Sequence, residues 1–182
     1  MIENNQIKKD SNIEIVIIAG NLNKEKSRYI YEFPNEFKIN FSLYGMGVDI
    51  EYLPRCMIYK GSFSPEELPN VLEGGYGLVW DGDSIEGCVG LAGKYLKYNN
   101  PHKASLYIAA GKPLIVWKKS AIAPYVCEKE IGITIDNLND LPHVLKCISK
   151  EKYMKLVRNV LKEREALING EHLKRIYMKI NS

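Results

Sequence analysis

Short runs of consecutive apolar residues alternate with helical patterns along most of the chain. The clearest runs are Ile13 to Ala19, Gly77 to Trp80 and Leu114 to Trp117, which have the length and the β-branched or aromatic content of buried strands. Further strand candidates are 39–44, 56–59 and 131–135. Because the runs are apolar at almost every position, we expect a parallel sheet that is covered on both faces. The predicted fold class is α/β and Rossmann-like, with helices on both faces of the sheet.

The helical patterns fall between these runs and after the last of them. Helices are expected at 24–31, 65–72, 101–110 and 121–129. Ser64 is the expected N-cap of the helix at 65–72. Asn100 is the expected N-cap of the helix at 101–110, with Pro101 in its first helical position. After residue 149, two amphipathic helices are expected, separated at Asn169 and Gly170. The apolar stripe of the last helix is Leu173, Ile176, Tyr177 and Ile180.

Composition is that of an ordinary globular protein. The chain has 182 residues and a formal net charge of +3. This composition excludes a disordered chain and a strongly basic nucleic-acid-binding arm as default interpretations. We expect a polar tail at 1–12 and one domain at 13–182. The tail is too polar for a signal peptide, no apolar run approaches the roughly 18 residues of a membrane span, and the four cysteines form no CxxC pair. These features favour reduced thiols, no zinc site and a cytoplasmic location.

The charge is uneven along the chain. After residue 149 there are nine Lys or Arg and four Asp or Glu, a surplus of 9 − 4 = +5. Such basic helix faces can bind anionic lipid or nucleic acid, but they are more often simply solvated, and we favour that interpretation.

The most informative chemistry is at the start of the helix expected at 101–110. Ligands of open parallel sheets lie beyond the carboxyl ends of the strands, where this segment falls. His102 and Lys103 belong to the first turn, where the positive end of the helix dipole disfavours cations unless an anion is bound. With Lys97 and the free N–H groups of the helix start, Lys103 could form a cradle for a diphosphate. The alternative is that both lysines point into water and that His102 caps or packs.

Aromatic residues near other strand ends suggest a base site. Tyr44, Tyr59 and Phe63 could stack on a nucleobase whose edge bonds to the turn at Gly61 and Ser62, although tyrosines at strand ends usually pack. Gly20 and Asn21 begin a turn open to phosphate. The chain lacks both GxGxxG and GxxxxGK[ST]. Their absence weakens the hypotheses that it is a nicotinamide dehydrogenase or a P-loop NTPase.

Asp81 and Asp83 flank a glycine and could hold Mg²⁺ or Mn²⁺ on a diphosphate. Since lysines and a helix end already meet the diphosphate charge, we favour capping or hydroxyl-binding roles for Asp81, Asp83 and Ser84 and expect no obligatory metal. No nucleophile triad or glycosidase-type carboxylate pair can be assigned from spacing.

Two motifs carry a family resemblance. Trp80-Asp-Gly-Asp-Ser84 and Lys97-Tyr-Asn-Asn-Pro-His-Lys103 resemble the C-terminal half of bacterial GT-B glycosyltransferases. The similar enzymes are galactofuranosyltransferases of surface-polysaccharide synthesis and the glucosyltransferase that extends glycans on serine-rich adhesins. The resemblance implies two facing Rossmann-like domains, with the nucleotide sugar on the C-terminal one and the acceptor on the other, and catalysis without an obligatory metal.

The resemblance also gives the candidate residues their roles in a UDP-sugar site. It implies that Lys97 and Lys103 neutralise the diphosphate, that Gly20 and Asn21 allow its close approach, and that Tyr59 to Phe63 flank the base. The complete predicted site is Gly20, Asn21, Tyr44, Tyr59, Gly61, Ser62, Phe63, Lys97, Asn99, Asn100, His102 and Lys103. It contains no assigned catalytic group.

The chain corresponds only to the donor half of such an enzyme. We therefore expect a hexosyltransferase of GT-B type that moves sugar from UDP to a carbohydrate or glycoprotein acceptor and is incomplete without an acceptor-binding domain. The apolar stripe of the last helix predicts self-association or a partner chain. Nucleic acid is not an expected partner, and contact with the inner face of the membrane would be peripheral. The alternative is a non-catalytic protein-interaction module that kept the fold.

Overall fold

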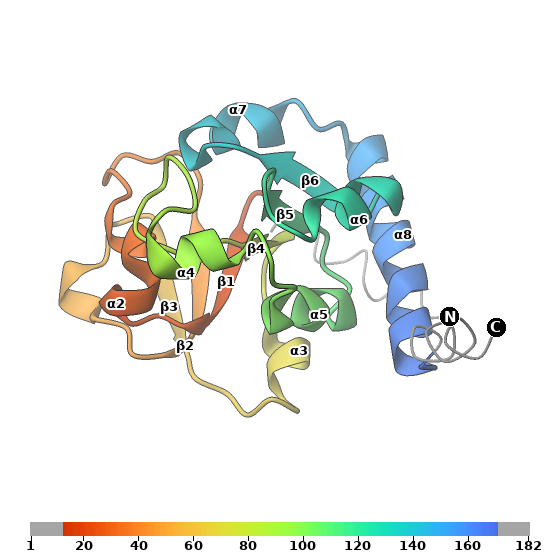
Figure 1. The fold of residues 1–182 in the computed structure, drawn as a ribbon, viewed down its shortest axis with the longest axis horizontal. Coiled ribbons are helices and arrows are strands. Elements are labelled where there is room, and N and C mark those ends of the chain that lie inside the picture. The colour runs from red at the N-terminus through yellow and green to blue at the C-terminus, as the bar shows by residue number, and fades with distance from the viewer. Residues whose placement is uncertain (1–12, 171–182) are drawn as a thin grey trace.

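The protein, described by a computed structural model over residues 13–170, is built on one six-stranded sheet (Figure 1). The strands are β1 Val16–Asn21, β2 Phe41–Met46, β3 Met57–Gly61, β4 Tyr76–Val79, β5 Leu114–Trp117 and β6 Gly132–Ile135. All neighbours are parallel, and the order is β3-β2-β1-β4-β5-β6. This is the doubly wound order, in which the direction of winding switches between β1 and β4. The predicted Rossmann-like class is confirmed.

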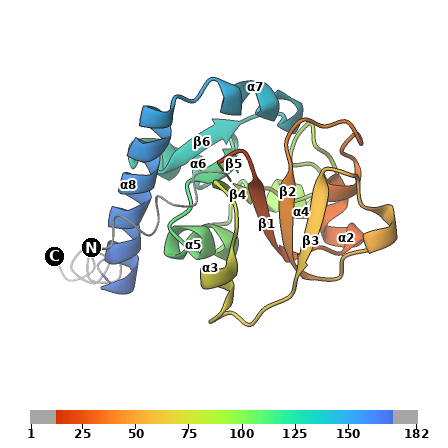
Figure 2. The ribbon, with the colours of Figure 1, turned by 180° about the vertical axis from the view of Figure 1, so that it is seen from behind.

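Helices connect the strands and cover the sheet. The α-helices are α2 Lys24–Ser27, α3 Leu68–Val71, α4 Gly90–Tyr95, α5 His102–Ala109, α6 Ala123–Glu128, α7 Leu141–Lys146 and α8 Lys150–Ile168. The 3-10 helices of residues 13–170 are η2 Arg28–Tyr31, η3 Ile50–Tyr52 and η4 Leu138–Asp140. In both views of the ribbon, α2 and α8 lie at opposite ends of the molecule (Figures 1 and 2).

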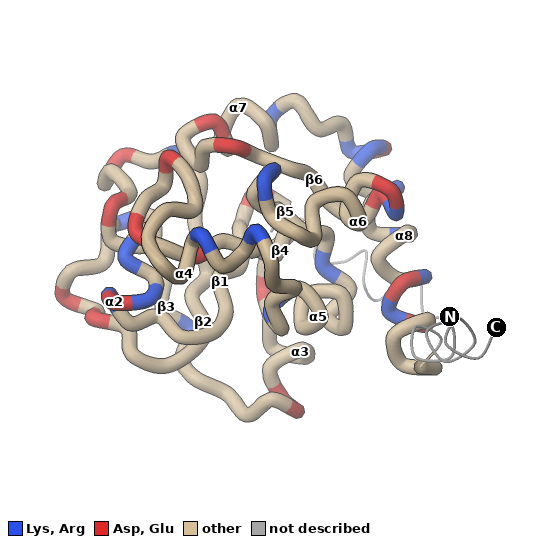
Figure 3. The backbone as a smooth tube through the Cα atoms, viewed as in Figure 1, with Lys and Arg blue, Asp and Glu red and all other residues tan. Residues whose placement is uncertain are grey.

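Alternate side chains of the strands enter two separate cores. Val16 and Ile18 of β1 pack with η2 and α7 on one face, whereas Ile17 packs with α5 and α6 on the other. Successive strand residues point to opposite faces, so a strand covered on both sides has no polar positions. Helix α8 contributes to both cores, through Leu156 and Val160 respectively. Lys and Arg are interspersed with Glu along α8 (Figure 3).

Some boundaries differ from those that the sequence predicts. Asn100 is not the N-cap of α5: Pro101 occupies that position with an extended backbone, ψ 141°, so the helix begins one residue later and no side chain caps it. Ser64 does not cap α3, whose N-cap is Glu67. The Ser64 hydroxyl instead accepts the Glu67 N–H at 3.3 Å, in the turn that precedes the helix.

Two helices, α4 and α7, were absent from the sequence prediction, whereas the end of α8 before Asn169 and Gly170 is confirmed. The expected tail at 1–12 and the expected last helix with its stripe at 173–180 lie outside the described residues. Within residues 13–170, no helix combines the length and the apolar character that crossing a bilayer requires.

Candidate functional site

A cavity of about 370 Å³ opens at the carboxyl ends of β1, β2 and β3. It brings together five of the predicted site residues, Gly20, Asn21, Tyr44, Ser62 and Phe63. The other lining residues are Asn23, Gly45, Met46, Gly47 and Leu68. Residues more than 40 positions apart in sequence therefore meet because parallel strands end at one edge of the sheet. We call this space the strand-end cavity.

Two glycines allow β1 and β2 to end side by side at this cavity. Gly45 has a φ of 141°, and a Cβ on it would overlap the carbonyl oxygen of Gly20. Gly20 has a φ of 131°, but a Cβ there would have no heavy atom within 4 Å. Gly45 is thus required by packing, whereas Gly20 leaves room where a ligand could approach the backbone.

Asparagine side chains organise the turn between β1 and α2. The Asn21 Oδ1 accepts the Asn23 N–H, and the Asn23 Oδ1 accepts the Glu25 N–H, each at 2.9 Å. The second bond caps α2. Both bonds use the carbonyl oxygens, and the nitrogen of each carboxamide carries two further donors.

The aromatic residues of the predicted base site have different environments. The Tyr44 hydroxyl donates to the Val71 carbonyl oxygen at 3.2 Å and accepts the Glu73 N–H at 2.9 Å, and burial raises its pKa. The Tyr59 hydroxyl donates to the Gly45 carbonyl oxygen at 2.9 Å, and Tyr59 does not line the cavity. Phe63 is 38% exposed, and its ring lies 6.1 Å from that of Tyr44. Phe63 is therefore the ring with a face available to a ligand.

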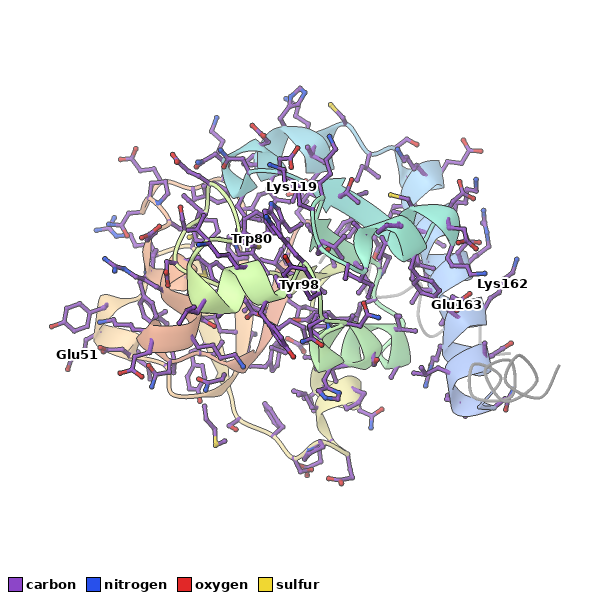
Figure 4. All side chains as sticks on the ribbon, in the orientation of Figure 1. Glu51, Trp80, Tyr98, Lys119, Lys162 and Glu163 are labelled. Carbon is purple, nitrogen blue, oxygen red and sulfur yellow. The ribbon has the colours of Figure 1, made fainter. Side chains whose placement is uncertain are left out.

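Lys103 is held by groups at the end of β4. Its Nζ lies 2.7 Å from the Asp81 Oδ1 and 3.1 Å from the Trp80 carbonyl oxygen. The two charged side chains are only 15% and 11% exposed. Asp81 is thus the counter-ion of Lys103, a pairing that the sequence analysis did not predict. Trp80, labelled in Figure 4, is fully buried and donates from its ring nitrogen to the Ser84 carbonyl oxygen at 2.9 Å.

Lys97 occupies a different environment. Its side chain is exposed, and its Nζ lies 5.7 Å from the centre of the Trp117 ring at the end of β5. The two lysines of the predicted cradle therefore have separate partners at the ends of two adjacent strands.

The remaining predicted residues lie near the start of α5 or beside Phe63. His102 is exposed and Asn99 is half-buried. Asn100 lines a second cavity of about 320 Å³, toward which Glu163 extends from α8 (Figure 4). Gly61 is not a lining residue, but a Cβ on it would contact the Phe63 ring at 3.5 Å.

The predicted site did not include five lining residues of the strand-end cavity, namely Asn23, Gly45, Met46, Gly47 and Leu68. The spacing Gly45-x-Gly47, directly after the strand expected at 39–44, was the available signal. Among residues 13–170, no group of three or more His, Cys, Asp or Glu side chains is placed to hold a metal ion.

Comparison with known proteins identifies the family. The sequence model of the glucosyltransferase 3-like C-terminal domain matches residues 16–180. The chain belongs to this family. The predicted resemblance is thereby confirmed, and the chain is a glycosyltransferase C-terminal domain.

Relatives of this glucosyltransferase 3-like domain are longer than the chain itself. It is 36% identical over 147 residues to the beta-1,6-galactofuranosyltransferase WbbI of Escherichia coli (strain K12), an alignment that covers 79% of this chain and 42% of that protein. It is 30% identical over 112 residues to glucosyltransferase 3 of Streptococcus gordonii, covering 62% of this chain and 33% of that protein. The chain thus spans less than half the length of these curated relatives.

A solved structure shares the fold of the domain. The crystal structure of Anabaena Alr3699/HepE in complex with UDP aligns with a TM-score of 0.50 and 14% identity, over 95% of this chain and 50% of that one. At this level of identity the match supports the Rossmann-like fold.

Proposed function

We propose that the chain binds the UDP moiety of a UDP-sugar and acts as the donor half of a glycosyltransferase that moves a hexosyl group to a carbohydrate or glycoprotein acceptor. The observation that carries this proposal is the convergence of Gly20, Asn21, Tyr44, Ser62 and Phe63 on one cavity. The cavity adjoins the switch between β1 and β4, where doubly wound sheets bind ligands. Two relatives named as sugar transferases and a UDP-bound structure of the same fold support it.

In this proposal the base stacks on the exposed face of Phe63, and the diphosphate lies between Gly20 and the start of α5. No side chain caps the first turn of α5. The Ala104 N–H donates to the Pro101 carbonyl oxygen at 3.0 Å, which leaves the N–H groups of His102 and Lys103 to an anion. Lys97 adds a positive charge, and Lys103 has one ammonium proton beyond those directed to Asp81 and Trp80. Negative charge grows on the diphosphate as the sugar leaves, and preorganised cations and amides stabilise it without requiring a metal.

The acceptor-binding part is proposed to lie outside this domain. Leu91, Tyr95 and Tyr98 are spaced i, i+4, i+7 along and just beyond α4 and are 93%, 62% and 82% exposed (Figure 4 labels Tyr98). Such an apolar group favours a covering partner, whether an acceptor-binding domain or chain or a second copy of this one. Alone, the domain should bind donor and transfer sugar poorly. A cytoplasmic location with at most peripheral membrane contact remains the prediction.

Calorimetric titration of UDP into the chain tests the proposal. Replacing Phe63 with Ala removes the stacking surface and is expected to weaken UDP binding by about 1–3 kcal/mol, or roughly five- to 150-fold. Ile58→Ala is the matched control, because Ile58 lies on β3, the edge strand that precedes Phe63, with 44% exposure but does not line the cavity. Lys97→Ala should weaken UDP more than uridine, since it contacts the diphosphate in this proposal.

Wild-type chain that gives no heat with millimolar UDP would instead support the alternative, a non-catalytic interaction module. Equal UDP affinity in the Phe63→Ala and Ile58→Ala variants would remove the strand-end cavity as the base site.

A further inference from the structure

Four residues form a cluster behind one wall of the strand-end cavity. The Lys24 Nζ, at the start of α2, lies 2.8 Å from the Asp49 Oδ2 and 3.6 Å from the centre of the Tyr52 ring. The Tyr31 ring centre lies 5.1 Å from the same nitrogen. An ammonium over aromatic rings is attracted by the negative ring faces, so the carboxylate and both rings hold Lys24 in place. We call Lys24, Tyr31, Asp49 and Tyr52 the lysine cluster.

The lysine cluster also connects two backbone segments. The Tyr31 hydroxyl donates to the Leu22 carbonyl oxygen at 2.9 Å and accepts the Asp49 N–H at 3.0 Å. Leu22 belongs to the turn between β1 and α2, and Asp49 to the loop between β2 and η3. One phenol and one ion pair thus join the turn to the loop.

Both connected segments supply cavity residues. Asn21, the last residue of β1, and Asn23 flank Leu22, and Met46, the last residue of β2, and Gly47 precede Asp49. The Leu22 N–H donates to the Met46 carbonyl oxygen at 2.9 Å, and a Cβ on Gly47 would lie 3.2 Å from the Asn23 Cβ. The pairing of β1 with β2 sets Met46 beside Asn21, whereas the spacing of Gly47 and Asn23, beyond the paired residues, depends on how the loop is held.

We infer that Lys24 is a positioning residue for the strand-end cavity. Its ammonium draws Asp49 and Tyr52 onto α2, and this fixes Gly47 against Asn23. The inference rests on the proposed function, because it takes the strand-end cavity to be the nucleotide site. Lys24 touches no ligand in this arrangement and acts through the loop, so the carboxylate of Asp49 is as necessary as the lysine.

Lys24 and Asp49 are 41% and 40% exposed, so their ion pair adds little to global stability and variants should fold. Lys24→Met and Asp49→Asn are each expected to weaken UDP binding about tenfold, within the range for residues of one coupled network. The double variant should lose no more than either single one. Lys24→Arg keeps the charge and the ring contacts and should bind within about threefold of wild type.

Uridine separates positioning from direct phosphate contact. A displaced wall weakens uridine and UDP by the same factor, whereas a lysine that contacts the diphosphate affects UDP alone, and Asp49→Asn would not reproduce its loss. Lys155→Met is the matched control, because Lys155 forms an exposed ion pair with Glu130 at 2.7 Å on distant α8.

The test therefore titrates UDP and uridine into the wild-type chain and these variants, with amide hydrogen exchange over residues 44–53 as a second measurement. Equal losses for both ligands, with faster exchange of the loop in Lys24→Met, support the inference. Wild-type UDP affinity in Lys24→Met, or a loss confined to UDP, overturns it. Absence of UDP binding by the wild-type chain would refute the proposed function itself. Failure of the proposed function is therefore distinguishable from failure of the inference about Lys24.

Discussion

Lys103 illustrates how a single side chain can look like a ligand group and yet hold the fold. Its ammonium and the Asp81 carboxylate are largely buried and 2.7 Å apart. Loss of one member of such a pair leaves the other charge in a poorly solvated place. Substitutions at Lys103 will therefore disturb the end of β4 whether or not a diphosphate binds there. Lys97, which is exposed, is the more informative position for a binding test.

We predict that Lys103→Met lowers the free energy of unfolding by about 3–5 kcal/mol, because it leaves Asp81 buried and unpaired. The double variant Lys103→Met with Asp81→Asn should recover part of this loss. Urea denaturation of both variants, beside Lys155→Met, measures the effect. The exposed Lys155 pair should cost at most about 1 kcal/mol. A cost that small for Lys103→Met would show that the Asp81 pair contributes little.

At the scale of elements, the end of β2 requires a glycine at position 45, because a side chain there would overlap β1. We predict that Gly45→Ala destabilises the chain markedly more than Gly20→Ala, although both have positive φ. The new methyl at Gly45 overlaps the Gly20 carbonyl, whereas that at Gly20 meets open space and carries only the backbone strain of about 1–3 kcal/mol. Thermal unfolding of the two variants compares them, and similar melting temperatures would contradict the close approach of β1 and β2.

The elements show what sequence patterns could and could not supply. The runs at β1, β4 and β5 predicted strands because covering both faces leaves no polar position. Helix α4 escaped prediction since it contains Gly90 and Gly93, which lower helix propensity. Gly93 is nevertheless required, because a Cβ there would overlap the Cys88 backbone. Tertiary packing, which a sequence pattern does not describe, determines that this helix forms.

The candidate site, like the helices and strands, was predictable only in part. The rule that ligands lie beyond strand ends placed Gly20 and Phe63 near one another. The pairing of Lys103 with Asp81 depends on the path of the intervening α4, and no local pattern specifies that path. The lysine cluster was missed for a similar reason, since Lys24 and Asp49 meet only when β1 and β2 are paired.

For the whole molecule, buried thiol and phenol groups predict sensitivity to alkali. Burial raises the pKa of the Cys88 thiol from 9.0 to about 12 and raises the pKa values of Tyr29, Tyr76 and Tyr107. The folded state thus retains protons that the unfolded chain releases. The stabilisation is complete below pH 9 and is lost as the pH rises toward 12, by about 1.4 kcal/mol per pH unit for each such group.

Urea midpoints measured from pH 7 to pH 10.5 should therefore fall only above about pH 9. Cys88→Ala removes one of these groups and should reduce the steepness of the decline, whatever it does to stability at pH 7. An identical slope in that variant would mean that the Cys88 thiol ionises as easily in the folded protein as in the unfolded chain.

The central place of β1 has a consequence for synthesis on the ribosome. β1 pairs with β2 on one side and β4 on the other, and β4 follows β1 by more than fifty residues. A nascent chain long enough to join β1, β2 and β3 still leaves one backbone edge of Val16 and Ile17 without its neighbour. Open edges of apolar strands recruit other chains, so the interval before β4 emerges is when this protein most needs a chaperone.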